Sequence, residues 1–155
     1  MKKIKIGILG AGRGIDIAQN LMLLDCEIVA LCDFNEKRRN EGIEKLGIEV
    51  KAFDSFDDFI EYDMDAVVLA NYFHEHAEFA IKALKAGKHV LSECVAMGTL
   101  AEGVALCRAV EESGKIYMIA ENYPFTKARM EMRRLYQSGE LGEILYGEGE
   151  YCHPI

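Results

Sequence analysis

The sequence predicts an α/β fold built on a doubly wound parallel sheet. Short apolar runs rich in β-branched residues alternate along the chain with longer segments of helical periodicity, which is typical of βαβ units. The runs are largely apolar, as expected for strands that helices cover on both faces. At 155 residues, of which 50% are hydrophobic, the chain can bury one core of domain size.

Six strands are expected, separated by helices whose ends carry capping residues. Thr99 and Glu102 have the spacing of an N-cap hydroxyl and an N3 carboxylate, which predicts a helix start. Gly87 and Gly114 stand where a left-handed residue ends a helix. The predicted strands cover residues 3–9, 27–32, 49–53, 65–70, 88–92 and 115–120.

Composition and charge argue against several classes of partner. A net charge of −8 and a pI near 5.0 argue against nucleic acid, whose binding needs clustered basic residues. The apolar run after the basic start ends at Leu9, too short for a signal sequence or a membrane span, so we expect a cytoplasmic protein with no membrane partner. The five cysteines are odd in number and include no C-x-x-C pair, which predicts neither a disulfide framework nor a metal site.

A glycine-rich loop follows the first predicted strand and precedes a helix. Gly10 allows the tight turn, Gly12 lets the backbone approach a pyrophosphate, and the helix N-terminus supplies amides and a positive dipole end. Asp33 ends the second strand about 20 residues after Gly12, where a carboxylate accepts ribose hydroxyls. Together the loop and the carboxylate predict a Rossmann domain that binds a dinucleotide.

Two details qualify this loop and its cofactor. The third glycine of G-x-G-x-x-G falls at Ile15, with Gly14 one residue early, which predicts a slightly wider packing of helix against strand. Asp33 repels a 2′-phosphate, so NAD is the expected cofactor. The basic run Lys37–Arg39 leaves NADP as the alternative, with Arg38 as a cofactor-binding residue, unless these side chains only form a solvated helix face.

The end of the chain has a different organisation. Residues 123–142 are predicted to form a linking segment, with a helix over 125–138, and 143–155 to contain one more strand. A strand outside a completed six-stranded sheet needs a partner. We therefore expect a dinucleotide-binding domain over 1–122, followed at 143–155 by the first strand of a second α/β substrate domain that this chain lacks, or by a strand that pairs with another copy in a homo-oligomer.

Several further motifs occur in a fixed order after the Gly10–Gly14 loop. They lie at residues 30–33, 65–70, 74 and 76, 86–91, 92–95, 121–123 and 139–144. Together they resemble the N-terminal domain of the Gfo/Idh/MocA oxidoreductases, the family of glucose-fructose oxidoreductase and inositol dehydrogenase. The resemblance implies hydride transfer between a bound nicotinamide and a sugar, polyol or related carbonyl substrate, held between this domain and a C-terminal α/β domain.

The resemblance also implies site residues, and here the chain departs from the family. Members carry Glu-Lys-Pro after the fifth strand, where the lysine polarises and protonates the reacting oxygen; this chain has Glu93-Cys94-Val95. A thiol of ordinary pKa is a weak donor at pH 7. Cys94 is a candidate catalytic residue if the helix at Thr99 or a histidine activates it, and otherwise a small buried hydrophobe. Asn71-Tyr72 stands in place of the Thr-Pro that usually ends the fourth strand in the family.

Two histidines follow the fourth strand, at the edge of the sheet where ligands bind. His76 is a candidate catalytic acid or base and His74 a candidate nicotinamide contact, with capping or surface roles as the alternative. A metal site formed by both with Glu93 or Cys94 lacks a known zinc spacing. The full set of expected cofactor-binding residues is Gly10, Gly12, Arg13, Gly14, Ile15, Asp33, Arg38, Asn71, His74, Glu93 and Asn122.

Three functions are compatible with these features. The first is an NAD(P)-dependent oxidoreductase acting on a sugar-like CH–OH or carbonyl substrate. The second is an NAD-dependent glycosidase that oxidises the sugar transiently, and the third is an NAD-binding regulator without catalysis, suggested by Cys94 at the lysine position. Without a second domain to close the site, this chain alone is expected to bind cofactor but to be inactive.

Overall fold

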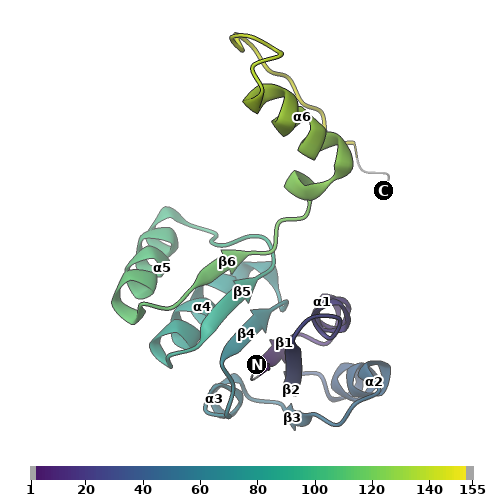
Figure 1. Cartoon of the computed structure of the whole chain (residues 1–155). Helices are drawn as coiled ribbons and strands as arrows, with labels where there is room; N and C mark the ends of the chain where they lie inside the picture. The colour runs from purple at the N-terminus through teal and green to yellow at the C-terminus, as the bar shows by residue number, and fades with distance from the viewer. Residues whose placement is uncertain (1–2, 153–155) are drawn as a thin grey trace. The chain divides into compact units, whose positions relative to one another are not determined.

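A six-stranded parallel sheet forms the centre of residues 3–120 (Figure 1). The structure is a computed structural model that describes residues 3–152, in two units that divide between residues 120 and 121. The strand order is β3-β2-β1-β4-β5-β6, which confirms the doubly wound sheet. The strands are β1 (Ile4–Leu9), β2 (Cys26–Cys32), β3 (Lys51–Phe53), β4 (Ala66–Leu69), β5 (His89–Ser92) and β6 (Tyr117–Ile119).

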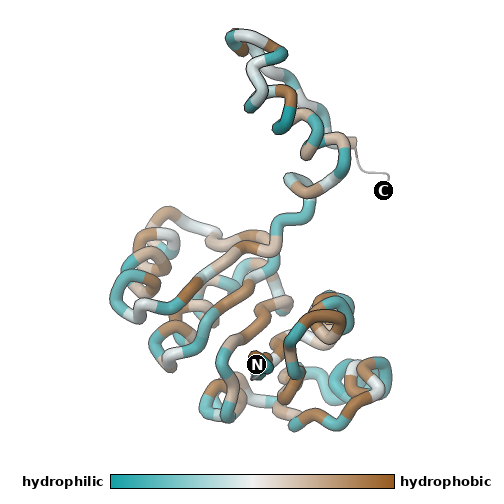
Figure 2. The backbone as a smooth tube through the Cα atoms, viewed as in Figure 1, coloured by the Kyte–Doolittle hydropathy of each residue, from teal (hydrophilic) through white to brown (hydrophobic). Residues whose placement is uncertain are grey.

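Helices cover both faces of this sheet, and each face has its own apolar core. On one face α1 (Arg13–Leu21) and α2 (Glu36–Leu46) pack on β1 and β2. On the other face lie α3 (Phe56–Ile60), α4 (His76–Lys85) and α5 (Leu100–Ser113). Figure 2 shows the hydrophobic residues concentrated along the strands between the two layers. Burial on both faces explains why the strands are almost continuously apolar.

The strand register aligns the carboxyl ends of four neighbouring strands. Leu9 pairs with Cys32 on one side and with Leu69 on the other, and Leu69 pairs with Ser92. The loops that follow β2, β1, β4 and β5 therefore begin at one edge of the sheet. The strand order reverses between β1 and β4, which is where open α/β sheets bind ligands.

The helix ends confirm the predicted capping residues. Thr99 Oγ1 accepts a hydrogen bond from the Glu102 amide at 3.2 Å, while Glu102 Oε2 accepts from the Thr99 amide at 2.8 Å. Hydrogen bonds from the Gly98 and Thr99 amides to the Glu102 carboxylate lower the pKa of Glu102. Gly87 and Gly114 adopt φ of 76° and 63°, the left-handed conformation expected at a helix end.

The second unit, residues 121–152, contains a short 3₁₀ turn (Tyr123–Phe125) and α6 (Lys127–Gln137), within the predicted helical segment. The strand predicted after α6 is wrong for the residues described: 143–152 contain no strand, and 153–155 lie outside the described residues. A strand forms only through hydrogen bonds to a neighbour, and the six-stranded sheet includes no pairing with this segment. No helix within residues 3–152 is long and apolar enough to span a membrane.

Candidate nucleotide-binding site

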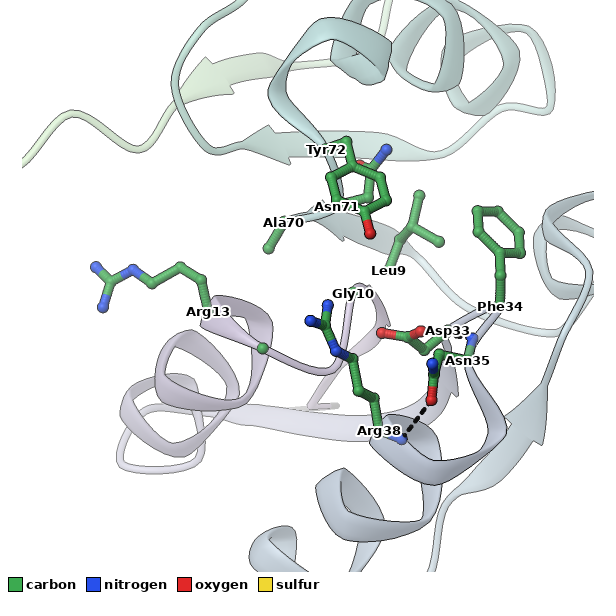
Figure 3. A pocket seen from close by; sticks show the side chains of 11 residues that line it. Leu9, Gly10, Arg13, Asp33, Phe34, Asn35, Arg38, Ala70, Asn71 and Tyr72 are labelled. Carbon is green, nitrogen blue, oxygen red and sulfur yellow. Dashed lines mark hydrogen bonds between the residues drawn. The ribbon is translucent and has the colours of Figure 1, made fainter.

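A pocket of about 330 Å³ lies at the aligned carboxyl ends of β1, β2 and β4 (Figure 3). It is enclosed by the loops that follow these three strands, together with the first turns of α1 and α2. Its volume is in the range of small-molecule sites in proteins. The lining residues are Leu9, Gly10, Gly12, Arg13, Asp33, Phe34, Asn35, Arg38, Ala70, Asn71 and Tyr72.

The glycines of the first loop differ in what a side chain would meet. Gly10 has φ +98°, and a Cβ there would lie 2.3 Å from the carbonyl oxygen of Ala70. Only glycine therefore allows the loops after β1 and β4 to approach this closely. At Gly12 a Cβ would meet no atom within 4 Å, so this backbone faces open space in the pocket wall. A phosphate group can approach the chain at Gly12.

Gly14 provides the helix–strand contact that the sequence pattern assigns to a third glycine. A Cβ at Gly14 would lie 2.7 Å from Cγ2 of Ile8 on β1. The expectation of a wider packing at this loop is therefore wrong, because the close contact is made one residue earlier. Ile15 points into the core, 3% exposed, beside Gly42 of α2. Its side chain does not line the pocket.

Asp33 ties two of the loops together. Its Oδ2 accepts a hydrogen bond from the Ala11 amide at 2.8 Å, and its Oδ1 accepts one from the Asn35 amide, also at 2.8 Å. Each carboxylate oxygen has a second lone pair that can accept a hydrogen bond from a hydroxyl group. Asp33 is thus held in the pocket wall by the backbone and still has the capacity to bind two ribose hydroxyls.

The three basic residues after Asp33 have different surroundings. Asn35 caps α2 by accepting from the Arg38 amide at 3.0 Å, which places Arg38 on the first turn with its side chain directed toward the pocket (Figure 3). Arg39 donates to the carbonyl oxygen of Asp33 at 2.7 Å. Lys37 is 85% exposed and lies 3.9 Å from Glu41. Only Arg38 is placed to contact a ligand.

An ion pair links the glycine loop to the end of β5. Arg13 Nε lies 2.8 Å from Glu93 Oε1, and this hydrogen bond raises the pKa of Arg13. The Glu93 side chain is only 17% exposed. Arg13 also lines the pocket next to the N-terminus of α1. Arg13, Arg38 and the helix N-terminus therefore supply positive charge on the phosphate side of the pocket.

Asn71 presents a buried acceptor at the opposite wall. Its Nδ2 donates to Glu75 Oε2 at 3.0 Å, whereas its Oδ1 is buried and has no hydrogen-bond partner among the residues described. A buried acceptor without a donor costs about 1–3 kcal/mol. A hydroxyl or amide of a ligand in the pocket would satisfy it, so this atom and the open backbone at Gly12 both fit a nucleotide.

Three of the predicted site residues, His74, Cys94 and Asn122, do not line the pocket. His74 is exposed on the 3₁₀ turn Phe73–Glu75 and stacks on Tyr72. Cys94 is partly buried just after β5, and its amide donates to Glu93 Oε2 at 3.3 Å. Asn122 belongs to the second unit. The contributions of His74, Cys94 and Asn122 to a site stay predictions.

His76, the candidate acid or base, is a core residue. It is 1% exposed, and its Nδ1 lies 3.0 Å from the carbonyl oxygen of Val95. Because a carbonyl only accepts, Nδ1 must carry the proton. Nε2 is buried with no partner among residues 3–152. The geometry supports a role in holding the segment after β5, and gives no sign of contact with solvent or with the pocket.

Sequence reasoning missed five lining residues, which directly adjoin predicted ones. Phe34 and Asn35 follow Asp33, Ala70 and Tyr72 flank Asn71, and Leu9 precedes Gly10. Their position just after predicted strands could have identified them as pocket residues, since the loops that follow parallel strands meet at one edge of the sheet.

The glycine loop, the acidic residue and the strand order together match a known family. A model described as an oxidoreductase family with an NAD-binding Rossmann fold (GFO_IDH_MocA) matches residues 4–121, well over half of the chain. The chain belongs to this oxidoreductase family. The match confirms the predicted family, the Rossmann fold and NAD as the family's cofactor.

The relatives of this family member include polyol dehydrogenases. Inositol 2-dehydrogenase from Salmonella typhimurium is 29% identical over 153 residues, which are 96% of this chain and 46% of that protein. A glycosyl hydrolase family 109 protein from Porphyromonas gingivalis is 30% identical over 166 residues, covering all of this chain and 36% of that protein. The chain therefore spans less than half the length of these curated relatives.

Solved structures show the same fold. The structure of scyllo-inositol dehydrogenase from Lactobacillus casei with bound NAD(H) and scyllo-inositol superposes with a TM-score of 0.84 at 25% identity, covering 92% of this chain and 43% of that one. A probable dehydrogenase from Thermotoga maritima gives a TM-score of 0.82 at 29% identity, covering 90% of this chain and 42% of that one.

Proposed function

We propose that this chain is the NAD(H)-binding part of a dehydrogenase that oxidises a hydroxyl group of a sugar or polyol. The observation that carries the proposal is the position of Asp33, held by two backbone amides beside the glycine loop in a pocket at the strand-order reversal. This is the arrangement by which Rossmann domains bind a dinucleotide. The inositol dehydrogenases among the relatives support a polyol as the substrate class.

Each part of the pocket has a role in this proposal. Asp33 accepts the hydroxyls of the adenine-side ribose, and Gly12 with the N-terminus of α1 binds the diphosphate. Arg13 neutralises its charge, Arg38 faces the ribose side, and Asn71 Oδ1 accepts a hydrogen bond from the ligand. The bound nicotinamide supplies the hydride acceptor. Glu93 and Cys94, at the end of β5, are proposed to border the reacting end.

NAD-dependent glycoside cleavage is the second candidate, because several relatives are named glycosyl hydrolase family 109 proteins. Assays of the full-length protein distinguish the dehydrogenase from the glycosidase. A dehydrogenase forms one NADH for each inositol oxidised, whereas the glycosidase releases the leaving group of an aryl glycoside with catalytic NAD⁺ and no net NADH. NAD⁺ binding without turnover of either substrate class contradicts both and leaves the regulator.

Other properties stay predictions. We propose the dinucleotide-binding domain over 1–122, a linking segment over 123–142, and 143–155 as the start of a substrate domain. A homo-oligomer, the absence of a nucleic-acid partner and a cytoplasmic location also stay predictions, and of these the acidic net charge supports the second.

Arg38 is expected to set the preference between NAD⁺ and NADP⁺. Its guanidinium faces the pocket from the first turn of α2, one turn beyond Asp33, where a 2′-phosphate would lie. Arg38→Ala should weaken NADP⁺ binding about tenfold more than NAD⁺ binding. Lys37→Ala removes the same charge from an exposed neighbour and should leave the ratio unchanged. Equal effects of the two substitutions in calorimetric titration would contradict this assignment.

A further inference from the structure

The segment that follows β5 is bonded to side chains from both α4 and the first turn of α1. Residues 93–98 form no helix or strand, and Val95 is 46% exposed. On the α4 side, His76 Nδ1 lies 3.0 Å from the carbonyl oxygen of Val95. On the α1 side, Arg13 Nε donates to Glu93 Oε1 at 2.8 Å. An irregular and partly exposed segment is thereby held from two sides.

Packing alone does not explain a histidine at the start of α4. The Nε2 atom of His76 is buried and has no hydrogen-bond partner among residues 3–152. A buried nitrogen without a partner lowers stability, whereas a leucine would fill the same space without that cost. The hydrogen bond from Nδ1 to Val95 is the contact that a leucine could not make.

The Glu93 carboxylate is fixed through both of its oxygens. Oε1 accepts from Arg13, and Oε2 accepts from the Cys94 amide at 3.3 Å. Only 17% of the Glu93 side chain is exposed, which leaves it little room to move. Cys94 directly precedes Val95, so the bond from His76 restrains the same short stretch of backbone that supplies this amide.

Arg13 keeps donors for a ligand while Glu93 holds it. Of the five N–H groups of a guanidinium, the bond to Glu93 uses the one on Nε, and the contact between Nη1 and Asp16 is long at 3.5 Å. Arg13 lines the nucleotide pocket, and in Figure 3 its side chain leads away from Asp33. A side chain that is already oriented loses less conformational freedom when it binds a phosphate.

We propose that His76 and Glu93 are positioning residues for nucleotide binding, which orient Arg13 toward the diphosphate. His76 fixes the backbone after β5, this backbone fixes the Glu93 carboxylate, and the carboxylate fixes the guanidinium. This role rests on the nucleotide site proposed above. The opposite role for Glu93 is competition, in which its negative charge occupies Arg13 and repels the diphosphate. Removing the charge weakens binding in the first case and strengthens it in the second.

Glu93→Ala is the first test, measured by calorimetric titration of the chain with NAD⁺ and with ADP, which has the diphosphate but no nicotinamide ribose. We expect both nucleotides to bind about three- to tenfold more weakly, because Arg13 loses its fixed orientation. Asp16→Ala removes the same charge from an exposed position near Arg13 and should not weaken either nucleotide. Tighter or unchanged binding by Glu93→Ala would overturn the proposal, as would a loss for NAD⁺ alone.

Substitutions of His76 are the second test. His76→Leu should weaken NAD⁺ and ADP binding about threefold or more, with an unfolding midpoint close to that of the unmodified chain. His76→Asn keeps an N–H near the position of Nδ1 and should restore binding. In the Glu93→Ala background His76→Leu should have no further effect, since both act through Arg13. His89→Leu is the matched control, because His89 bonds to the Ile116 amide at the other end of β5 and should not affect binding.

The outcomes separate this role from the nucleotide site itself. Additive losses from His76→Leu and Glu93→Ala would overturn the positioning role, as would a His76→Leu chain that binds both nucleotides like the unmodified one. Either result leaves the nucleotide site in place. An unmodified chain that binds neither nucleotide would overturn the site and the positioning role together.

Discussion

Gly12→Ala should abolish measurable NAD⁺ binding while leaving the protein folded. A methyl group at Gly12 meets no protein atom within 4 Å, so it projects into the space that the diphosphate needs. We expect the affinity for NAD⁺ to fall by about a hundredfold or more, measured by calorimetric titration. The thermal unfolding midpoint should stay close to that of the unmodified chain.

Gly10→Ala is the matched comparison, with its main effect on stability. Its Cβ would lie 2.3 Å from the carbonyl oxygen of Ala70, at a φ of +98° that residues with a side chain rarely adopt. We expect a loss of about 3 kcal/mol in the free energy of unfolding. If Gly12→Ala instead unfolds the protein, or binds NAD⁺ normally, the assignment of Gly12 to the diphosphate is wrong.

Asp33→Ala should also weaken NAD⁺ binding by about a hundredfold or more, because it removes two hydrogen bonds to a charged acceptor worth about 1.5–3 kcal/mol each. It should lower stability too, since the Ala11 and Asn35 amides lose their acceptor. Asp33→Asn separates the two effects of charge and hydrogen bonding. Removing the negative charge should improve NADP⁺ binding relative to NAD⁺. Unchanged NAD⁺ affinity in both variants would contradict the ribose assignment.

The sheet could be predicted because burial on both faces leaves a strong pattern. Runs such as 65–70 and 88–92 are apolar throughout and are bounded by helical segments, and the structure places β4 and β5 inside them. The strand predicted at 143–151 has the same local pattern but no neighbour in the sheet. Local sequence indicates the tendency to extend, whereas a strand depends on a partner that the pattern cannot supply.

The site could be predicted in part. Gly10, Gly12 and Asp33 could be identified from the sequence, because the glycines allow a specific backbone conformation, Asp33 accepts hydrogen bonds, and their spacing is fixed. The structure brings all three to one pocket. Arg38 was named as a cofactor-binding residue, but the sequence alone gives no physical reason to prefer it to Lys37 or Arg39. That reason lies in where the Asn35 cap starts α2, which is a matter of side-chain geometry.

His76 is a residue that the sequence suggested for the site but that the structure places in the core. Its place after a strand suggested a reactive imidazole, but the side chain turns into the core and bonds to the Val95 carbonyl. The direction of a side chain at a helix start is set by packing between helix and sheet, which one sequence does not reveal.

The central claim is that this chain by itself forms a competent NAD(H) site, and calorimetric titration of the purified chain with NAD⁺ and with NADP⁺ tests it most directly. We predict saturable binding of one NAD⁺ per chain, tighter than NADP⁺. A chain that is folded by its thermal transition and yet binds neither nucleotide would contradict the assignment of the pocket between β1, β2 and β4.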